Sequence, residues 1–251
     1  MLRSVKELYN YILAATDAEI GRCKDFLFDD DRWVIRYMVA DAGKWLPGKR
    51  VLISPIALGE PDWRTRRFPV LLEKRKIEAA PHLDEDAPVS RQYEQQWFQH
   101  YGWPGYWTGT GLWGTAEHPG ALFPPMAVEP APAAHTRTPE DNTRLRSTKE
   151  VGGYHLQAQD GKIGHIDDFI VNDREWIIRY LVVDTRNWLP GRKVLVPPTW
   201  LADVDWAHWL VKVDLSREDI QNSPEYDPHA PVNREYEVRL YDYYGRPKYW
   251  G

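Results

Sequence analysis

Apolar and polar residues follow one another in short runs along this chain, and the runs are separated by Gly, Pro and Asp turns. This pattern predicts strands rather than long helices. The runs are rich in Val, Ile, Trp and Tyr, which suit a pleated and half-buried backbone. The predicted strands lie at 11–15, 20–28, 33–41, 51–53 and 70–72, and at 154–158, 163–171, 176–184, 194–196 and 211–215.

Two segments depart from this pattern and show helical spacing. In 89–101 the aromatic residues Tyr93, Trp97 and Tyr101 are four positions apart, as are Tyr236, Leu240 and Tyr244 in 232–244. Such a stripe predicts an amphipathic helix that packs on the domain or on a partner. A shorter helical turn is expected at Ser216–Ile220, where Ser216 is followed three residues later by Asp219. The predicted fold class is therefore all-β with short helices.

The whole pattern occurs twice. Residues 2–107 align with 145–250 at a fixed offset of 143 without a gap, and 46 of the 106 pairs are identical. Self-similarity over about 100 residues indicates a duplicated domain. We therefore expect a first copy at 1–109, a linker at 110–143 and a second copy at 144–251.

The predicted linker is rich in Gly and Pro, with no periodicity, as is typical of an extended connection. It also carries apolar residues, including Leu112 and Trp113. Free linkers rarely contain so much apolar surface, so we expect part of this linker to pack on one or both domains.

Composition narrows the class of partner. The net charge is −5 and the pI about 5.9, which argues against nucleic acid as a partner. No apolar run approaches the roughly 18 residues of a membrane helix, so no membrane insertion is expected. The single Cys23 excludes an internal disulfide, and residues 1–7 lack the apolar core of a signal peptide. A cytoplasmic bacterial protein is the default expectation.

The longest strictly repeated block is Trp-Leu-Pro-Gly, at 45–48 and again at 188–191. Pro followed by Gly suits the two central positions of a type II turn, because Gly accepts a positive φ. The block therefore predicts a hairpin whose tip presents Trp45 and Leu46 in one copy and Trp188 and Leu189 in the other.

Four motifs in the same order in both copies resemble the PRC-barrel domain. In copy 1 they are Gly-x-Cys-x-Asp-Phe at 21–26, Trp-x-Ile-Arg-Tyr-x-Val-x-Asp at 33–41, Trp-Leu-Pro-Gly at 45–48 and Val-Leu-Ile-x-Pro at 51–55. The resemblance covers nearly all of both copies and implies two small β-barrels, or strongly bent sheets, each followed by its amphipathic C-terminal helix. It also implies a docking or assembly role and brings no catalytic residues with it.

One arginine in each copy lies in the apolar central strand, Arg36 in the first and Arg179 in the second. A buried guanidinium requires a partner, so we expect a structural ion pair in each copy. The candidate acids shared by the copies are Asp25 and Asp41 in copy 1 and Asp168 and Asp184 in copy 2. The run 29–31 of three Asp lacks the alternating spacing of a calcium loop, and it is expected to be a solvated turn.

No recognised constellation of catalytic, cofactor-binding or metal-ligating residues stands out. The His residues are scattered, no His-x-x-x-His occurs, and phosphate-binding and nucleophile motifs are missing from the sequence. No catalytic residue, cofactor or metal site is therefore predicted.

The leading hypothesis is a non-enzymatic module that docks protein partners, with the two copies packing as an intramolecular pseudo-dimer. Its candidate contact residues are aromatic or apolar and belong to the repeat, namely Trp45, Leu46, Trp63, Trp188, Leu189 and Trp206, together with the C-terminal aromatic helices. Two alternatives remain: a carbohydrate or other small-molecule binding protein that uses aromatic surfaces, and an enzyme with a site between the domains.

Overall fold

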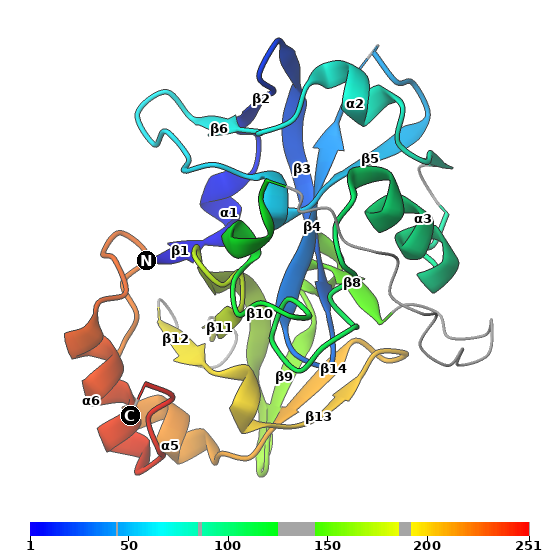
Figure 1. The fold of residues 1–251 in the computed structure, drawn as a ribbon. Helices are drawn as coiled ribbons and strands as arrows, with labels where there is room; N and C mark the ends of the chain where they lie inside the picture. The colour runs from blue at the N-terminus through cyan, green and yellow to red at the C-terminus, as the bar shows by residue number, and fades with distance from the viewer. Residues whose placement is uncertain (44, 85–86, 125–143, 186–191, 251) are drawn as a thin grey trace. The chain divides into compact units, whose positions relative to one another are not determined.

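The computed structural model describes residues 1–43, 45–84, 87–124, 144–185 and 192–250 (Figure 1). Most of their regular structure is β-sheet, with short helices, as the sequence predicts. The strands form two seven-stranded sheets. Among the described residues, no helix is long and apolar enough to cross a membrane.

The chain forms two compact units whose boundaries differ from those of the sequence repeats. Unit 1 contains Met1–Glu7, Thr148–Asp173 and Ile178–Gly251, and unit 2 contains Leu8–Ser147 and Arg174–Ile177. The N-terminal residues thus belong with the second repeat, although the sequence assigns them to the domain at 1–109.

The sheet of unit 2 has the strand order β6-β2-β3-β4-β5-β7, and β8 pairs with β3 off this path. Its centre is the antiparallel pair of β3 and β4, whereas β2 and β6 pair in parallel. The first seven residues of β4 are buried, which confirms the predicted central strand. The strands are β2 (Ile12–Ala14), β3 (Glu19–Asp29), β4 (Val34–Asp41), β5 (Lys49–Ile53), β6 (Arg67–Pro69), β7 (Leu83–Asp84) and β8 (Leu145–Ser147).

The sheet of unit 1 has the strand order β12-β11-β10-β9-β14-β13, with β1 paired to β10 off this path. Its central strands β10 and β11 are antiparallel, and β9 and β14 are parallel. The strands are β1 (Leu2–Ser4), β9 (His155–Ala158), β10 (Gly161–Asn172), β11 (Ile178–Asp184), β12 (Lys193–Val196), β13 (Leu201–Asp205) and β14 (Leu210–Val213).

Short helices connect or follow these strands. They are α1 (Val5–Leu8), the 3₁₀ turn η1 (Pro55–Ala57), α2 (Lys74–Glu78), α3 (Arg91–Tyr101), η2 (Pro119–Leu122), α4 (Thr148–Val151), η3 (Pro198–Trp200), α5 (Arg217–Asn222) and α6 (Arg234–Tyr244). The predicted capping box is confirmed at α5, where Ser216 and Asp219 bond reciprocally. The two predicted aromatic helices are α3 and α6, and their stripes contain the buried Tyr93, Trp97 and Leu240.

Neither sheet closes into a barrel through its described strands. The hydrogen-bonded path ends at β12 and β13 in unit 1, and at β6 and β7 in unit 2. The prediction of closed β-barrels is corrected in this respect. A physical reason lies just after β12, where Pro197 and Pro198 lack the N–H groups that a further ladder needs and begin η3 instead.

The shared glycine of β3 and β10 is required by a close approach of two backbones. A Cβ at Gly21 would lie 2.0 Å from the Asp41 carbonyl oxygen, and one at Gly164 would lie 2.0 Å from that of Asp184. The sequence pattern predicted such an approach or a bulge, and the structure confirms it.

The two repeats exchange their first strands. Strand β1 of the first repeat pairs with β10, and β8 of the second repeat pairs with β3. Each exchanged strand is held by a carboxylate: the Ser4 hydroxyl donates to Asp168 at 2.5 Å, and the Ser147 hydroxyl donates to Asp25 at 2.5 Å. Asp168 and Asp25 therefore each bind a strand that comes from the other repeat.

A second exchanged segment, 174–177, belongs to unit 2 although it lies in the second repeat. Its Trp176 is buried, and the ring centroid lies 6.0 Å from that of Phe26 and 6.1 Å from that of Phe68. The core of unit 2 thus includes an aromatic residue from the second repeat.

Candidate functional site

A buried glutamate joins helix α3 to the sheet of unit 2. Glu94 is fully buried and accepts hydrogen bonds from the hydroxyls of Tyr37 at 2.9 Å and Tyr106 at 3.0 Å. Its other oxygen lies 2.9 Å from the Arg91 guanidinium. Arg36 completes the arrangement, with its guanidinium carbon 3.9 Å from the centre of the Tyr106 ring. We call these five residues the Glu94 network.

The same network recurs in unit 1. Glu237 accepts from the hydroxyls of Tyr180 and Tyr249, both at 2.7 Å, and lies 3.0 Å from the Arg234 guanidinium. Arg179 lies 4.1 Å from the centre of the Tyr249 ring. We call this set the Glu237 network. The sequence signal for both is the identity of all five residues between copies, although the prediction singled out the central-strand arginines alone.

Burial governs the electrostatics of the Glu94 network. It raises the pKa of the Glu94 carboxyl from 4.5 to about 7, against the lowering effects of Arg91 and of the tyrosine hydrogen bonds. Burial also raises the pKa of Tyr37, and the neighbouring Glu94 carboxyl adds to that rise. The hydroxyls therefore stay protonated and act as donors, as a structural polar core requires.

The central-strand arginine of copy 1 forms an ion pair, but with an acid other than the predicted ones. Arg36 Nε lies 2.5 Å from Asp29 Oδ2. Asp25 instead holds Ser147, and Asp41 accepts from the backbone N–H of Gly43. The register of β3 and β4 shifts at Leu27/Phe28 and skips Arg36, which accounts for the different partner.

The Asp run at 29–31 is a solvated turn only in part, because Asp31 is exposed in the turn whereas the side chains of Asp29 and Asp30 are buried. Asp29 is buried with Arg36, and Asp30 lies 3.1 Å from Arg146 Nε on the exchanged strand β8. Burial raises the pKa of Asp30, against the lowering effect of Arg146. Asp29 therefore belongs to the core of unit 2, and Asp30 helps to hold the exchanged strand β8.

In copy 2 the position of Asp29 is taken by Asn172. Asp168, one predicted partner of Arg179, is used by the N-terminal segment, where it accepts from the Ser4 hydroxyl and from the backbone N–H of Lys6. Asp184 is buried at the end of β11, and its pairing with Arg179 stays a prediction.

Part of the predicted linker packs on the Glu94 network, as expected from its apolar residues. Arg36 donates to the Leu112 carbonyl at 2.6 Å, and Arg32 donates to the Gly111 carbonyl at 2.7 Å. Trp113 is fully buried, lies 5.0 Å from the Arg36 guanidinium, and donates from its indole N–H to the Glu175 carbonyl at 2.8 Å. We call residues 111–113 the covering segment.

The covering segment makes the two networks differ in exposure. Arg36 is 1% exposed and Tyr106 is 7% exposed, so the guanidinium and ring of unit 2 are enclosed. In unit 1, Arg179 is half-buried and Tyr249 is 37% exposed. The half-buried Arg179 and the exposed Tyr249 form what we call the aromatic face of unit 1.

The predicted Trp-Leu-Pro-Gly tip is described in copy 1 alone. Gly48 has a φ of 70°, which agrees with the predicted turn. Trp45 and Leu46 are half-buried; the Trp45 indole donates to Glu78 and its ring lies 4.9 Å from Lys74 Nζ. The tip thus packs on α2. Trp188 and Leu189 lie outside the described residues.

The other predicted contact residues, Trp63 and Trp206, are half-buried. The Trp63 ring lies 5.9 Å from Tyr11, and the Trp206 ring lies 6.1 Å from Tyr154, between centroids. Each therefore packs on the tyrosine that precedes the first hairpin of its repeat, and their role in partner binding stays a prediction.

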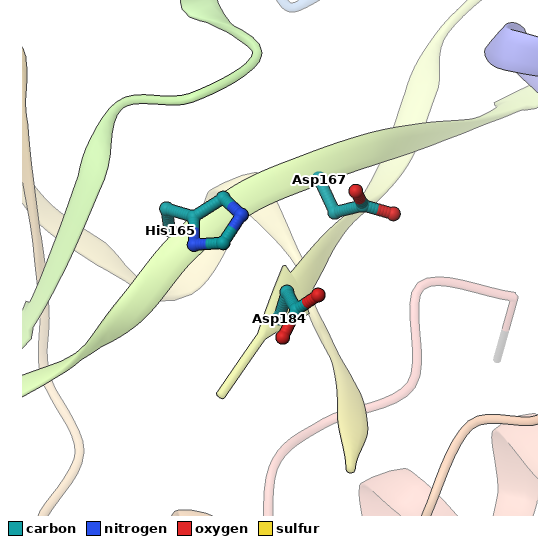
Figure 2. Close-up of side chains that lie close together, drawn as sticks. All are labelled: His165, Asp167 and Asp184. Carbon is teal, nitrogen blue, oxygen red and sulfur yellow. The ribbon is translucent and has the colours of Figure 1, made fainter. Parts of the chain in front are cut away.

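One cluster of metal-ligand types was not foreseen in the sequence. His165 and Asp167 on β10 and Asp184 on β11 bring one potential ligand atom each within 4.8 Å of one another (Figure 2). Their two-residue spacing on a strand was the available signal. Asp167 already lies 2.7 Å from both Lys6 and Lys193, which lower its pKa against the effect of burial. A cation would have to compete with two ammonium groups, so the cluster is better suited to fastening the N-terminal segment.

These observations define a β-sheet protein in which the same buried polar network occurs in both units. Comparison with known families finds a PRC-barrel domain at residues 156–220, which runs from β9 into α5. Comparison with curated proteins finds no match.

Proposed function

We propose that this protein is a non-enzymatic binding and assembly module built from two PRC-barrel-like domains, and that it docks protein partners. The family match at 156–220 and the 46 identities in 106 repeated positions support a duplicated module. Both Glu networks consist of the same residue types in corresponding elements, which supports a common origin for the two copies.

The observation that carries the docking role is the difference between the two networks. In unit 2 Arg36 lies over the Tyr106 ring and donates to a carbonyl of the chain's own covering segment. In unit 1 the equivalent tyrosine, Tyr249, is 37% exposed. Aromatic and arginine side chains dominate protein interfaces, so the aromatic face of unit 1 is the proposed contact surface.

The exchange of strands β1 and β8 supports the pseudo-dimer hypothesis. Two chains of a single-repeat relative could exchange their first strands in the same way, which is a low-cost route to a dimer. We propose that the duplication fused such a swapped pair into one chain. A cytoplasmic location remains part of this proposal.

A carbohydrate-binding role has less support. Among the described residues, Trp209 is the one exposed tryptophan, with 63% of its surface accessible. The predicted Trp63 and Trp206 pack on Tyr11 and Tyr154 instead. No adjacent pair of exposed tryptophans is formed by these residues.

The test is site-specific photo-crosslinking in the cells that make the protein. A photoreactive phenylalanine analogue replaces Tyr249, which is 37% exposed, in one variant, and Leu71, which is 39% exposed in unit 2, in the control. The proposal expects a discrete protein adduct from position 249 that is missing from position 71. Adducts that are equal at both positions, or no protein adduct from 249, contradict docking through this surface.

A further inference from the structure

We propose that His155, His165 and Asp184 form a binding site for a divalent metal ion of the zinc class. The three residues come from the adjacent strands β9, β10 and β11 of unit 1. Two imidazoles and one carboxylate are a donor set that zinc binds in proteins. This inference goes beyond the proposed docking function and does not depend on it.

The register of the sheet places these residues in one row. His165 is the register partner of His155 on one side and of Asp184 on the other. Residues directly opposite on neighbouring strands share one face of a sheet, with Cβ atoms roughly 4.5–5.5 Å apart. A ring nitrogen of His165 and a carboxylate oxygen of Asp184 lie within 4.8 Å of each other (Figure 2). The middle residue of the row can therefore share a metal ion with a neighbour on either side.

Exposure decreases along the row and provides both an entrance and an anchor. His155 is exposed, His165 is half-buried and Asp184 is 1% exposed. The imidazole of His155 has to turn toward His165 when the metal binds, and an exposed side chain changes rotamer readily. The buried carboxylate attracts a cation more strongly than an exposed one does, because less water screens it. A metal ion is thus expected to enter beside His155 and to be held by Asp184.

The ammonium groups near the row are held by a different carboxylate. Asp167 lies 2.7 Å from the side-chain nitrogens of Lys6 and Lys193, one at each of its oxygens. We therefore leave Asp167 out of the ligand set. Lys193 is also the register partner of Asp184. Its ion pair with Asp167 compensates its positive charge, which limits its repulsion of a metal ion bound in the row.

The first repeat shows that a cation suits this position of the fold. The corresponding row of unit 2 is Ile12, Arg22 and Asp41, in the same register. A permanently charged guanidinium is thus the register partner of the aspartate that both repeats share. In unit 1 the imidazole of His165 is opposite Asp184 instead. A metal ion bound by this imidazole would place a positive charge at the same point of the sheet.

The experiment titrates the metal-free full chain with Zn²⁺ in competition with a chromogenic chelator, and we expect saturable binding. His165→Arg and His155→Ile introduce the residues that the first repeat has at these positions, so both variants are compatible with the fold. Each should weaken Zn²⁺ binding at least about tenfold, since the loss of even an outer-shell partner costs about that factor. His208→Ala is the matched control, because it removes an exposed imidazole that pairs with Asp205 in the same unit. It should leave the affinity unchanged.

A second measurement locates the metal ion in the wild-type chain. Diethyl pyrocarbonate modifies accessible imidazoles, and mass spectrometry identifies the modified residues. We expect Zn²⁺ to protect His155 and His165 and to leave the modification of His208 unchanged. Absence of saturable binding, wild-type affinity in either His165→Arg or His155→Ile, or protection only of histidines outside the row would overturn the proposal.

Discussion

At the scale of single residues, the structure places ionisable groups where charge is costly and then surrounds them with donors. Glu94 is the clearest case, because two tyrosine hydroxyls and Arg91 reach a carboxyl that water does not. A buried network of this kind fixes the position of a helix on a sheet, since removing one member leaves the others without partners.

The raised pKa of Glu94 gives the first prediction. Between pH 4.5 and 7 the folded chain binds more protons at this carboxyl than the unfolded chain does. The free energy of unfolding should therefore fall as the pH rises through this window, by about 3 kcal/mol from this group, and level off above it. Urea denaturation of wild type and of Glu94→Gln at several pH values measures this pH dependence of the free energy of unfolding. We expect the dependence to be smaller in the variant. Parallel profiles for the two proteins would show that Glu94 is not responsible.

The glycine in the central hairpin gives the second prediction. Gly164→Ala places a methyl group 2.0 Å from a backbone carbonyl that cannot move without breaking the β10–β11 ladder. We expect a loss of stability of about 2–4 kcal/mol, measured by chemical denaturation. Gly120→Ala is the matched control, because the nearest atom to its Cβ is a His118 side-chain atom at 3.6 Å. Similar losses in both variants would contradict the close-approach explanation.

At the scale of elements, the exchanged strands are held by their own aspartates. Asp168 accepts from Ser4 and from the backbone of Lys6, and Asp25 accepts from Ser147. Each carboxylate therefore controls one strand, and the strand that it controls belongs to the other repeat.

A pair of variants tests this exchange. Asp168→Ala is expected to speed amide hydrogen exchange at Leu2–Ser4, because it removes the acceptors of this segment, at a cost of about 1–3 kcal/mol in local stability. Asp25→Ala should instead speed exchange at Leu145–Ser147. The reverse assignment, with Asp168→Ala loosening 145–147, would mean that each strand pairs within its own repeat.

The sequence predicts the elements well and the pairing of the exchanged strands not at all. Alternation, turn residues and helical spacing locate the central strands, the capped α5 and the aromatic α3 and α6. Residues 2–4 and 145–147, however, are both Leu-Arg-Ser, so local sequence is equally compatible with either sheet. The choice depends on how the whole chain is connected, which no local pattern contains.

The partner of Arg36 was missed for a related reason. Regular alternation made Asp25 and Asp41 the shared acids of interest, whereas a bulge at Leu27/Phe28 removes Arg36 from the ladder and places it beside Asp29. Asp29 is replaced by Asn172 in the second repeat. A search for acids that are shared by both repeats therefore does not find it. The Glu networks were missed because their members are 57 and 12 residues apart in each repeat.

At the scale of the whole molecule, two nearly identical networks have unequal surroundings. The covering segment encloses one, and the other keeps an exposed tyrosine. The enclosed network therefore belongs to the core of unit 2, and the proposed docking function assigns recognition to the other.

The stabilising role of the covering segment gives a further prediction. Trp113→Ala removes a fully buried indole and its hydrogen bond to the Glu175 carbonyl, so we expect a loss of about 3–5 kcal/mol in the free energy of unfolding. Trp209→Ala, at a tryptophan that is 63% exposed, should change stability by about 0.5 kcal/mol or less. Thermal and urea denaturation measure both. Equally small stability losses for Trp113→Ala and Trp209→Ala would show that the covering segment contributes little to the stability of unit 2.

The strand exchange also determines what becomes of the protein when its chain is cut. Cleavage anywhere in 125–143 breaks the peptide link between the repeats, yet the N-terminal fragment keeps β1, which unit 1 needs, and the C-terminal fragment keeps β8 and Trp176, which unit 2 needs. Each fragment carries part of the other's sheet. A nicked molecule is thus expected to survive as a non-covalent pair, and neither half is a self-sufficient unit for expression, evolution or transfer to another protein.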